Sequence, residues 1–427
     1  MSIPLPGRDL PLVPRTFRAL GHRDFRLLWL GQLVSLTGSW MQSVAQGWLV
    51  LRLGNSAFHL GLVGFCNFAP VLLFALVAGV AADRLARRRA LYWTQASAMV
   101  LAFTLAALTA TGTVRVWHVA LLAFGAGTAG AFDIPIRQSL LQDLVGREDL
   151  PNAIALNSLA FNGARLLGPA LGGLLLAAAG EEVVFLVNGL SYLAVIVGLA
   201  LMRARPATTP RKASDSWIAG MREGIAWVRG SRKARLFLAL VSISSVFGLP
   251  YSILLPVFAR DVLGVGARGL GFLTGATGLG ATVGALYVAG RGTRGRGVLV
   301  ATAMGLLGAS LVAFALSRAF ALSLLLLVVV GAAMIVQMAT SNTLLQLLAP
   351  EELRGRIVSF YMLAFLGTAP VGSLLAGTLA HALGTPAAVA IGGAVCIVAA
   401  LWFAFRLPHL RRGDVPDLQR RSRISTS

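Results

Sequence analysis

The feature that most constrains this chain is a succession of long apolar runs separated by short polar loops. A run of about 20 apolar residues lets a helix cross the hydrocarbon core of a bilayer, and the helix satisfies its own backbone hydrogen bonds. Twelve such runs can be placed, at 25–52, 57–82, 90–111, 116–142, 152–179, 183–203, 235–260, 269–290, 297–317, 320–348, 355–383 and 386–407. The pattern predicts an all-α membrane protein with twelve transmembrane helices.

Composition separates the membrane interpretation from a nucleic-acid interpretation. Hydrophobic residues make up 57% of the chain and charged residues 12%, whereas a soluble domain carries roughly 25% charge. The net charge of +21 lies in short clusters between apolar runs. We therefore expect the lipid bilayer as a partner and no nucleic acid. Cys66 and Cys396 both lie inside apolar runs, so we expect neither a metal nor another cofactor.

The distribution of Lys and Arg predicts the orientation. Nearly all of the 37 basic residues lie on one side if the N-terminal tail, alternate loops and the C-terminal tail share that side. The other side has Arg52, Arg115, Arg260, Arg268 and Arg318. Cytoplasmic loops carry the excess of Lys and Arg, so both termini are expected in the cytoplasm and the number of spans is even.

A polar interruption at 204–234 divides the chain. Its apolar residues at helical spacing, beside several Arg residues, predict a basic amphipathic helix on the inner leaflet; they are Trp217, Ile218, Met221, Ile225 and Val228. The segment 138–142 recurs as 342–346, which indicates two six-helix halves. The expected regions are a cytoplasmic tail at 1–24, a first half at 25–203, the linker at 204–234, a second half at 235–407 and a tail at 408–427.

Two motifs resemble signatures of the major facilitator superfamily. Gly79-Val-Ala-Ala-Asp83-Arg84-Leu-Ala-Arg87-Arg88-Arg89 is similar to G-x-x-x-D-R-x-G-R-R/K, with Ala86 in place of a glycine. Gly163-Ala-Arg-Leu-Leu-Gly168-Pro169-Ala-Leu-Gly172-Gly173 resembles the G-x₄-G-P-x-x-G-G of antiporters and exporters. The resemblance covers nearly the whole chain and is closest to the enterobactin-exporter-like and macrolide-efflux-like branch, on the stretches 38–42, 132–138 and 353–356. It implies the major facilitator fold and alternating access.

The sequence contains no motif that would bind a nucleotide as the energy source for transport. No G-x₄-G-K-[ST] occurs, so transport is expected to use a gradient or to be passive. There is no H-E-x-x-H and no Cys/His cluster, so the chain is not expected to be an enzyme.

Two intramembrane charges are candidates for proton coupling, Asp133 and Arg165. A charge at a helix centre costs about 2.5–3.5 kcal/mol on the insertion scale, so each is expected to face protein or a wet cavity. Asp133 could carry a proton in an antiporter, pair with Arg165, or pair with Arg137 one turn along its own helix. The repeat places Gln337 at the equivalent position of the second half, so carboxylate coupling would be confined to the first half.

Polar stripes mark candidate cavity residues. On span one they are Gln32, Ser35, Ser39, Gln42, Ser43 and Gln46, and on span ten Gln337, Met338 and Ser341. Such residues either join helices by hydrogen bonds or line a substrate cavity, which the resembled fold builds from spans one, four, seven and ten. We favour the cavity for span one and leave both open for span ten. Few charges in the stripes suit a hydrophobic or amphipathic solute.

The basic loop contains the gating candidates Gly79, Asp83, Arg84, Arg87 and Asp143. Its arginines are explained by topology alone. The resemblance implies more: Asp83 caps a second-half helix when the cytoplasmic side is shut, and Arg87 reaches Asp143. The antiporter-type motif of span five consists of Gly163, Gly168, Pro169, Gly172 and Gly173. These residues either serve helix packing alone or, as the resemblance implies, seal span five against a second-half helix.

These observations predict a monomeric secondary transporter of the bacterial cytoplasmic (inner) membrane. It exports a small hydrophobic or amphipathic molecule, a drug-like compound or a siderophore, by proton antiport. The alternatives are a lysophospholipid or lipid facilitator, a nutrient symporter, and, outside transport, a membrane scaffold or sensor.

Overall fold

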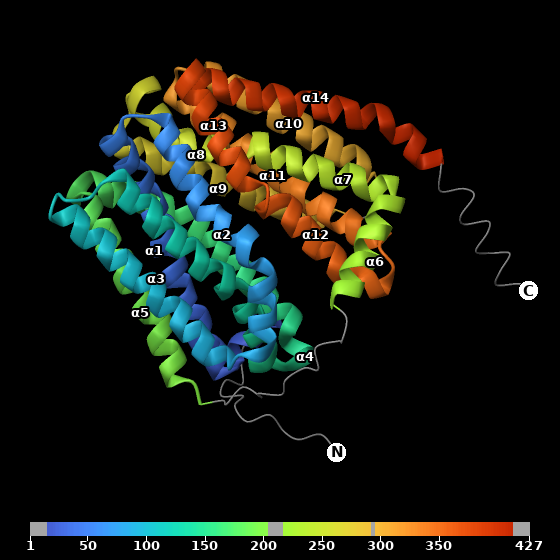
Figure 1. The fold of residues 1–427 in the computed structure, drawn as a ribbon, viewed down its shortest axis with the longest axis horizontal. Helices are drawn as coiled ribbons and strands as arrows, with labels where there is room; N and C mark the ends of the chain where they lie inside the picture. The colour runs from blue at the N-terminus through green and yellow to red at the C-terminus, as the bar shows by residue number, and fades with distance from the viewer. Residues whose placement is uncertain (1–14, 204–216, 292–294, 413–427) are drawn as a thin grey trace, which may run out of the picture.

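The computed structural model describes residues 15–203, 217–291 and 295–412, and within these ranges all regular structure is helical. The elements of the first half are η1 (Arg15–Gly21), α1 (Arg23–Gly54), α2 (Ala57–Arg84), α3 (Arg87–Ala110), α4 (Val116–Ala179) and α5 (Glu181–Leu201). Figure 1 shows them as one bundle. All-α architecture follows from the sequence pattern, because a buried backbone in lipid must bond within its own helix.

The second half follows the predicted amphipathic helix α6 (Trp217–Gly230). Its elements are α7 (Arg232–Ile243), η2 (Ser244–Gly248), α8 (Tyr251–Val257), η3 (Phe258–Val262), α9 (Gly266–Gly290), α10 (Arg296–Leu316), α11 (Phe320–Leu348), η4 (Glu351–Leu353), α12 (Arg354–Leu366), α13 (Ala369–Leu383) and α14 (Thr385–Arg412). Between α12 and α13 the chain is irregular around Gly367, and Pro370, which has no N–H group, opens the next helix.

Ten helical segments of the described chain are long and apolar enough to cross a membrane. One of them is α4, which covers both the fourth and the fifth predicted spans. The loop expected at 143–151 is almost absent: only Gly146, at φ 71°, leaves the helical conformation, and helix continues on both sides. Helix α1 is not among the ten, because its polar side chains lower its mean hydropathy.

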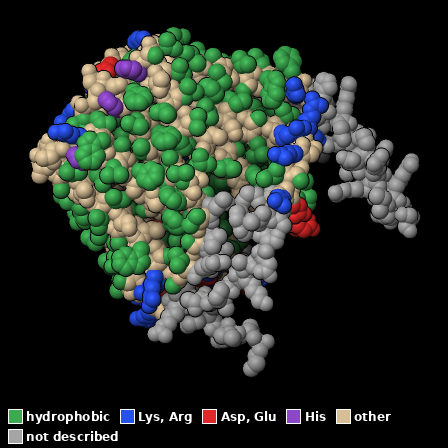
Figure 2. All heavy atoms as spheres, in the orientation of Figure 1, with side chains coloured by type: hydrophobic (Ala, Val, Ile, Leu, Met, Phe, Trp, Pro, Cys, Tyr) green, Lys and Arg blue, Asp and Glu red, His purple; other side chains and the backbone are tan. Residues whose placement is uncertain are grey.

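The outer surface is apolar, as a lipid-facing surface must be. Leu286, Leu316 and Phe405 are about 70% exposed. Figure 2 shows hydrophobic side chains over most of one face, with Lys and Arg gathered near its edges. The interior packs through small residues: a Cβ at Gly31 would lie 2.7 Å from the backbone of Ala194, so α1 and α5 pack almost backbone to backbone.

The two halves meet along two pairs of helices, α4 with α9 and α2 with α13. Each crossing is set by facing glycines, Gly173 with Gly271 and Gly61 with Gly377. These contacts lie toward the end of the bundle that holds the α1–α2 connection, which we call the α1–α2 end. At the opposite α6 end, Figure 1 shows α6 and α12 standing apart from the bend of α4.

Helix α6 packs against protein as well as carrying charge. Its Glu223 forms an ion pair with Arg356 of α12, and a Cβ at Gly224 would meet the ring of Phe360 at 2.7 Å. Trp227 and Val228 of α6 are partly buried against the core, whereas the side chains of Trp217, Ile218 and Met221, from the predicted apolar face, lie outside the described part of the structure.

Candidate functional site

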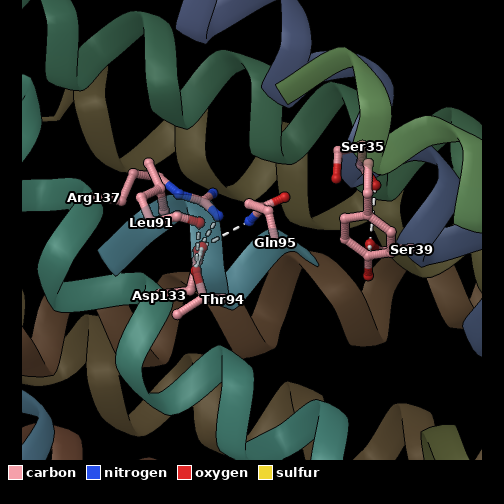
Figure 3. A network of polar contacts seen from close by, with 8 residues as sticks. Ser35, Ser39, Leu91, Thr94, Gln95, Asp133 and Arg137 are labelled. Carbon is pink, nitrogen blue, oxygen red and sulfur yellow. Dashed lines mark hydrogen bonds and ion pairs between the residues drawn. The ribbon is translucent and has the colours of Figure 1, made fainter. Parts of the chain in front are cut away.

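Asp133 is the centre of a buried polar network in the first half. Its side chain is 7% exposed, in the first segment of α4 (116–145). Thr94 Oγ1 donates to its Oδ1 at 3.0 Å and Gln95 Nε2 donates to the same oxygen at 2.7 Å, while Arg137 Nη2 donates to Oδ2. Figure 3 shows these groups converging from α3 and α4. The carboxylate therefore has one counter-charge and two neutral donors.

Arg137 extends the network to α1 and to the second segment of α4 (147–179). The amide of Gln32 is satisfied when its oxygen accepts from Arg137 Nη1 at 2.6 Å and its nitrogen donates to Asn157 Oδ1 at 2.9 Å. The ion pair is thus linked through Gln32 to two other helices. Four transmembrane segments share one set of hydrogen bonds.

A cavity of about 150 Å³ adjoins this network. Its lining is mixed, and all of it comes from α1, α3, α4 and α5: Gln32, Ser35, Leu36, Ser39, Thr94, Gln95, Ala98, Ala126, Ala129, Gly130, Asp133, Arg137, Tyr192 and Val195. This cavity therefore belongs to the interior of the first half and not to the interface between the halves. It is large enough for a few water molecules.

Span one divides into two groups. Gln32, Ser35 and Ser39 line the cavity, and Ser39 Oγ lies 3.2 Å from Tyr192 Oη. Gln42 instead accepts a hydrogen bond from Asn188 Nδ2 at 2.6 Å, so it joins α1 to α5. Gln46 is half-buried. Part of the stripe thus lines a small cavity and part joins two helices, and a role of this stripe in binding substrate stays a prediction.

The span-ten candidates lie elsewhere, inside the second half. Gln337 and Ser341 are fully buried and Met338 is 8% exposed. Ser244 Oγ donates to Gln337 Oε1 at 3.2 Å, and Gln337 Nε2 donates to Ser341 Oγ at 3.5 Å. In this structure these side chains join α11 to η2 by hydrogen bonds.

The alternative of an Asp133–Arg165 pair is not the one observed. The ion-pair partner of Asp133 is Arg137, one turn away on the same helix. The Arg165 guanidinium lies over the ring of Trp40, with 5.8 Å between the guanidinium carbon and the ring centroid. Helical geometry explains the outcome, because residues four apart on one helix always share a face. Asp133 and Arg165 lie on different segments of α4, so whether they meet depends on how those segments pack.

The basic loop contains the contact that the resemblance implied. Arg87 Nη1 lies 2.5 Å from Asp143 Oδ2, and both side chains are less than 20% exposed. Gly79 has open space around it. The side chains of Asp83 and Arg84 lie outside the described part of the structure.

The glycine motif of α4 has three kinds of position. A Cβ at Gly163 would have open space around it. A Cβ at Gly168 would lie 2.6 Å from Trp40 of α1, and one at Gly172 would lie 2.7 Å from Met41 of the same helix. A Cβ at Gly173 would lie 2.7 Å from Gly271 Cα of α9, in the other half. The motif thus packs one helix against its own half and the other half at once.

Four polar residues of this network were not candidates from the sequence: Thr94, Gln95, Asn188 and Tyr192. The adjacent polar pair in span three, and Asn188 and Tyr192 one turn apart in span six, were the available signals. Among the described residues, no group of three His, Cys, Asp or Glu side chains could hold a metal ion.

Comparison with known proteins agrees with this architecture. The model of the family described as transmembrane secretion effector matches residues 15–424. The multidrug efflux pump Tap of Mycolicibacterium fortuitum is 28% identical over 91% of this chain and 97% of its own length. The enterobactin exporter EntS of Shigella boydii is 25% identical over 92% of this chain and 93% of its own length.

A bacterial homologue of the human lysosomal transporter Spinster, solved inward-facing and occupied, has the same fold. The two structures superpose with a TM-score of 0.72 at 14% sequence identity. The match covers 92% of this chain and 97% of the Spinster homologue. Family, relatives and membrane helices together make this a multi-pass inner-membrane transporter and not an enzyme. The chain belongs to the transmembrane secretion effector family, in the efflux branch of the major facilitator superfamily.

Proposed function

We propose that this protein exports small hydrophobic or amphipathic molecules by proton antiport with alternating access, and that it works as a monomer. The observation that carries the proposal is the Asp133–Arg137 pair, buried at membrane depth beside a polar cavity. An intramembrane acid in such a place is by default a functional group. The similarity to a multidrug efflux pump and to an enterobactin exporter supports drug-like or siderophore substrates.

Proton binding at Asp133 would change its bonds in a defined way. A neutral carboxylic acid no longer balances the charge of Arg137 and accepts more weakly, so the bond from the guanidinium to the Gln32 amide oxygen gains relative weight. Gln32 lies on α1 and its other bond reaches Asn157 in the second segment of α4. Protonation would therefore bias the fit of α1 against α4, which is the kind of differential contact that shifts a two-state transporter.

The topology we propose has twelve crossings, six in each half. Helix α4 bends back at Gly146 and so supplies two crossings, and α1, with 32 residues, is long enough to supply another. Added to the other helical segments of membrane-crossing length, these complete the set. Excess Lys and Arg at the α6 end favours a cytoplasmic place for that end and for both termini.

The state described here supports an inward-facing assignment. Polar contacts across the halves lie at the α1–α2 end: Arg260 Nη2 donates to Asn55 Oδ1 at 2.6 Å, and Ser56 Oγ lies 3.3 Å from His381 Nδ1. If the α6 end is cytoplasmic, the transporter is closed toward the outside. We propose that the Arg87–Asp143 pair, within the first half, braces α3 against α4 at the opposite, cytoplasmic end as the halves move.

A second candidate function is a lipid facilitator. A groove of about 460 Å³ between α1 and α5 is lined mainly by apolar side chains: Leu33, Val34, Thr37, Gly38, Met41, Val187, Leu190 and Ser191. Its residues lie near the middle of both helices, where acyl chains are found. Mass spectrometry of lipids extracted with the purified protein tests this, because a facilitator should retain one lysophospholipid class far above its membrane abundance.

Transport by the purified protein in proteoliposomes tests the main proposal. An imposed pH gradient should drive uptake of a fluorescent drug such as ethidium in inside-out oriented protein, and Asp133→Asn should abolish the gradient-dependent part. Glu351→Gln is the matched control, because Glu351 forms an exposed ion pair with Arg354. Full gradient-driven transport by Asp133→Asn would rule out coupling through this carboxylate.

A further inference from the structure

Arg165 is a cation at membrane depth without an acidic partner in the described structure. It lies in the second segment of α4, where its backbone carbonyl packs 2.5 Å from the position a Cβ would take at Gly278 of α9. Its guanidinium takes part in no hydrogen bond or ion pair with a described residue. The other deeply placed arginine, Arg137, is by contrast fully engaged with Asp133 and Gln32.

The guanidinium stacks on one aromatic ring, and two further aromatic residues are linked to this pair. Trp40 of α1 lies beneath it, and the Trp40 ring is in edge contact with Phe161, with 6.0 Å between centroids. Tyr251 of α8, which is 4% exposed, interacts with Arg165 electrostatically. We call Trp40, Phe161, Arg165 and Tyr251 the Arg165 cluster.

The free donors of Arg165 indicate an accessible site. Five N–H groups without acceptors cost several kcal/mol in hydrocarbon, so such a side chain is retained where it faces a wet cavity or a bound group. Its nitrogen atoms are not among the fully occluded, unpartnered atoms of the structure, which are on His59, Gln95 and Thr340. Among the described residues the guanidinium therefore has no hydrogen-bonding or ion-pair partner, and Arg165 is partly exposed.

We infer that the Arg165 cluster binds the anionic group of an amphipathic substrate, whose aromatic or apolar body packs against Trp40 and Phe161. A guanidinium presents a planar fork of donors to a carboxylate, sulfonate or catecholate oxygen pair, and the aromatic rings supply apolar contact area. Because the cluster draws on α1, α4 and α8, a bound anion would contact both halves. The cluster thus assigns organic anions with an aromatic body as one class among the amphipathic substrates proposed above.

This inference rests on the proposed export function but assigns a site separate from Asp133. The cavity beside Asp133 is lined by the first half alone, whereas the Arg165 cluster includes Tyr251 of the second half. Proton and substrate would then bind at different places. Neutralising Arg165 should remove a preference for anions without removing the response to a proton gradient.

Binding to the purified full-length protein tests the inference directly. The probes are anilinonaphthalene sulfonate, which is anionic, and phenylnaphthylamine, its uncharged counterpart with the same two ring systems. Equilibrium dialysis against protein in phosphatidylcholine nanodiscs, corrected with empty nanodiscs, gives both dissociation constants. We expect the wild type to bind the sulfonate at least about tenfold more tightly once partition into lipid is subtracted, the size of one charge-assisted hydrogen-bonding contact. Equal affinities in the wild type would overturn the inference without any variant.

Variants then locate the preference. Arg165→Gln should lose the sulfonate preference and leave phenylnaphthylamine affinity within about twofold, whereas Arg165→Lys should retain part of it. Arg318→Gln is the control, because Arg318 bonds only backbone carbonyls near the end of α10. A sulfonate preference that survives Arg165→Gln, or an equal loss for both probes, contradicts the assignment.

A transport readout separates this inference from the proposed function. If Arg165→Gln still exports phenylnaphthylamine under a pH gradient but not the sulfonate, both stand. If wild-type protein binds the sulfonate through Arg165 but moves neither probe under any gradient, export fails and the binding site stands.

Discussion

The glycine motif of α4 predicts that one added methyl group shifts the conformational equilibrium. In Gly173→Ala the new Cβ would lie 2.7 Å from Gly271 Cα and 2.8 Å from Ala267 O, both backbone atoms of α9. Ordinary carbon contacts are about 3.5–4.0 Å, so α4 and α9 must separate by about 1 Å. Neither neighbour is a flexible side chain that could turn aside.

The energetic consequence falls on the state described here, which we propose to be inward-facing. Overpacking of this kind costs about 1–3 kcal/mol, and the penalty disappears where the two helices part. If the outward-open state parts them, as alternating access requires, its population relative to the inward-facing state rises by about 5- to 150-fold. The same substitution also raises helix propensity by up to about 1 kcal/mol, equally in both states.

Thiol labelling measures this shift. The chain has two cysteines, so Cys66→Ser and Cys396→Ser give a cysteine-free background. Gln46→Cys then places one thiol beside Gly47, whose added Cβ would lie 3.0 Å from Pro256 of α8 at the closed α1–α2 end. Labelling of intact cells by a membrane-impermeant maleimide should be several-fold faster or more with Gly173→Ala.

The motif supplies its own controls. Gly163→Ala adds a methyl group in open space and should leave the labelling rate unchanged, whereas Gly168→Ala presses on Trp40 within the first half and should lower stability without changing accessibility. The reasoning is refuted if Gly173→Ala labels at the parent rate, or if Gly163→Ala accelerates labelling equally.

Two further predictions concern charges. Arg137→Gln leaves the buried Asp133 carboxylate with only Thr94 and Gln95 as donors, so thermal unfolding in detergent should show a loss of about 2–4 kcal/mol, and Asp133→Asn with Arg137→Gln should recover at least half. A double variant no more stable than Arg137→Gln would mean that the pair is not the source of the loss. Arg87→Glu should slow ethidium efflux several-fold, because the new carboxylate repels Asp143. The charge exchange Arg87→Glu with Asp143→Arg should restore part of the efflux rate. Arg89→Glu is the control, because it changes the charge of the same loop by the same amount.

The sequence alone was sufficient for the membrane helices and the family. Apolar runs of bilayer length force helices, because lipid offers no partner for a free backbone. The two glycine-containing motifs indicated the superfamily that the family match confirms. The orientation inferred from loops with excess Arg stays a prediction. The helix at 217–230 also follows from residue spacing alone, since an amphipathic pattern needs no partner to be recognised.

The sequence was less informative about partners. Periodicity says which side chains share a helix face, but not how that helix is rotated or which neighbour it meets. Arg137 was a candidate partner of Asp133 because it lies four residues away, whereas Thr94, Gln95 and Gln32 reach the same pair from helices distant in the chain. The span-ten stripe could not be distinguished from a cavity wall until η2 was seen against it.

Tertiary structure alone decided how the two intramembrane charges are used. From the sequence, Arg165 on the next span and Arg137 on the same helix were alternative ion-pair partners of Asp133. Packing of α3 and α1 around the first segment of α4 encloses Asp133 with Arg137, while packing of the second segment between α1 and α9 turns Arg165 onto Trp40. The sequence determined that charges are buried in this membrane protein. The rotation of packed helices determined that, among the described residues, Asp133 has an ion-pair partner and Arg165 has none.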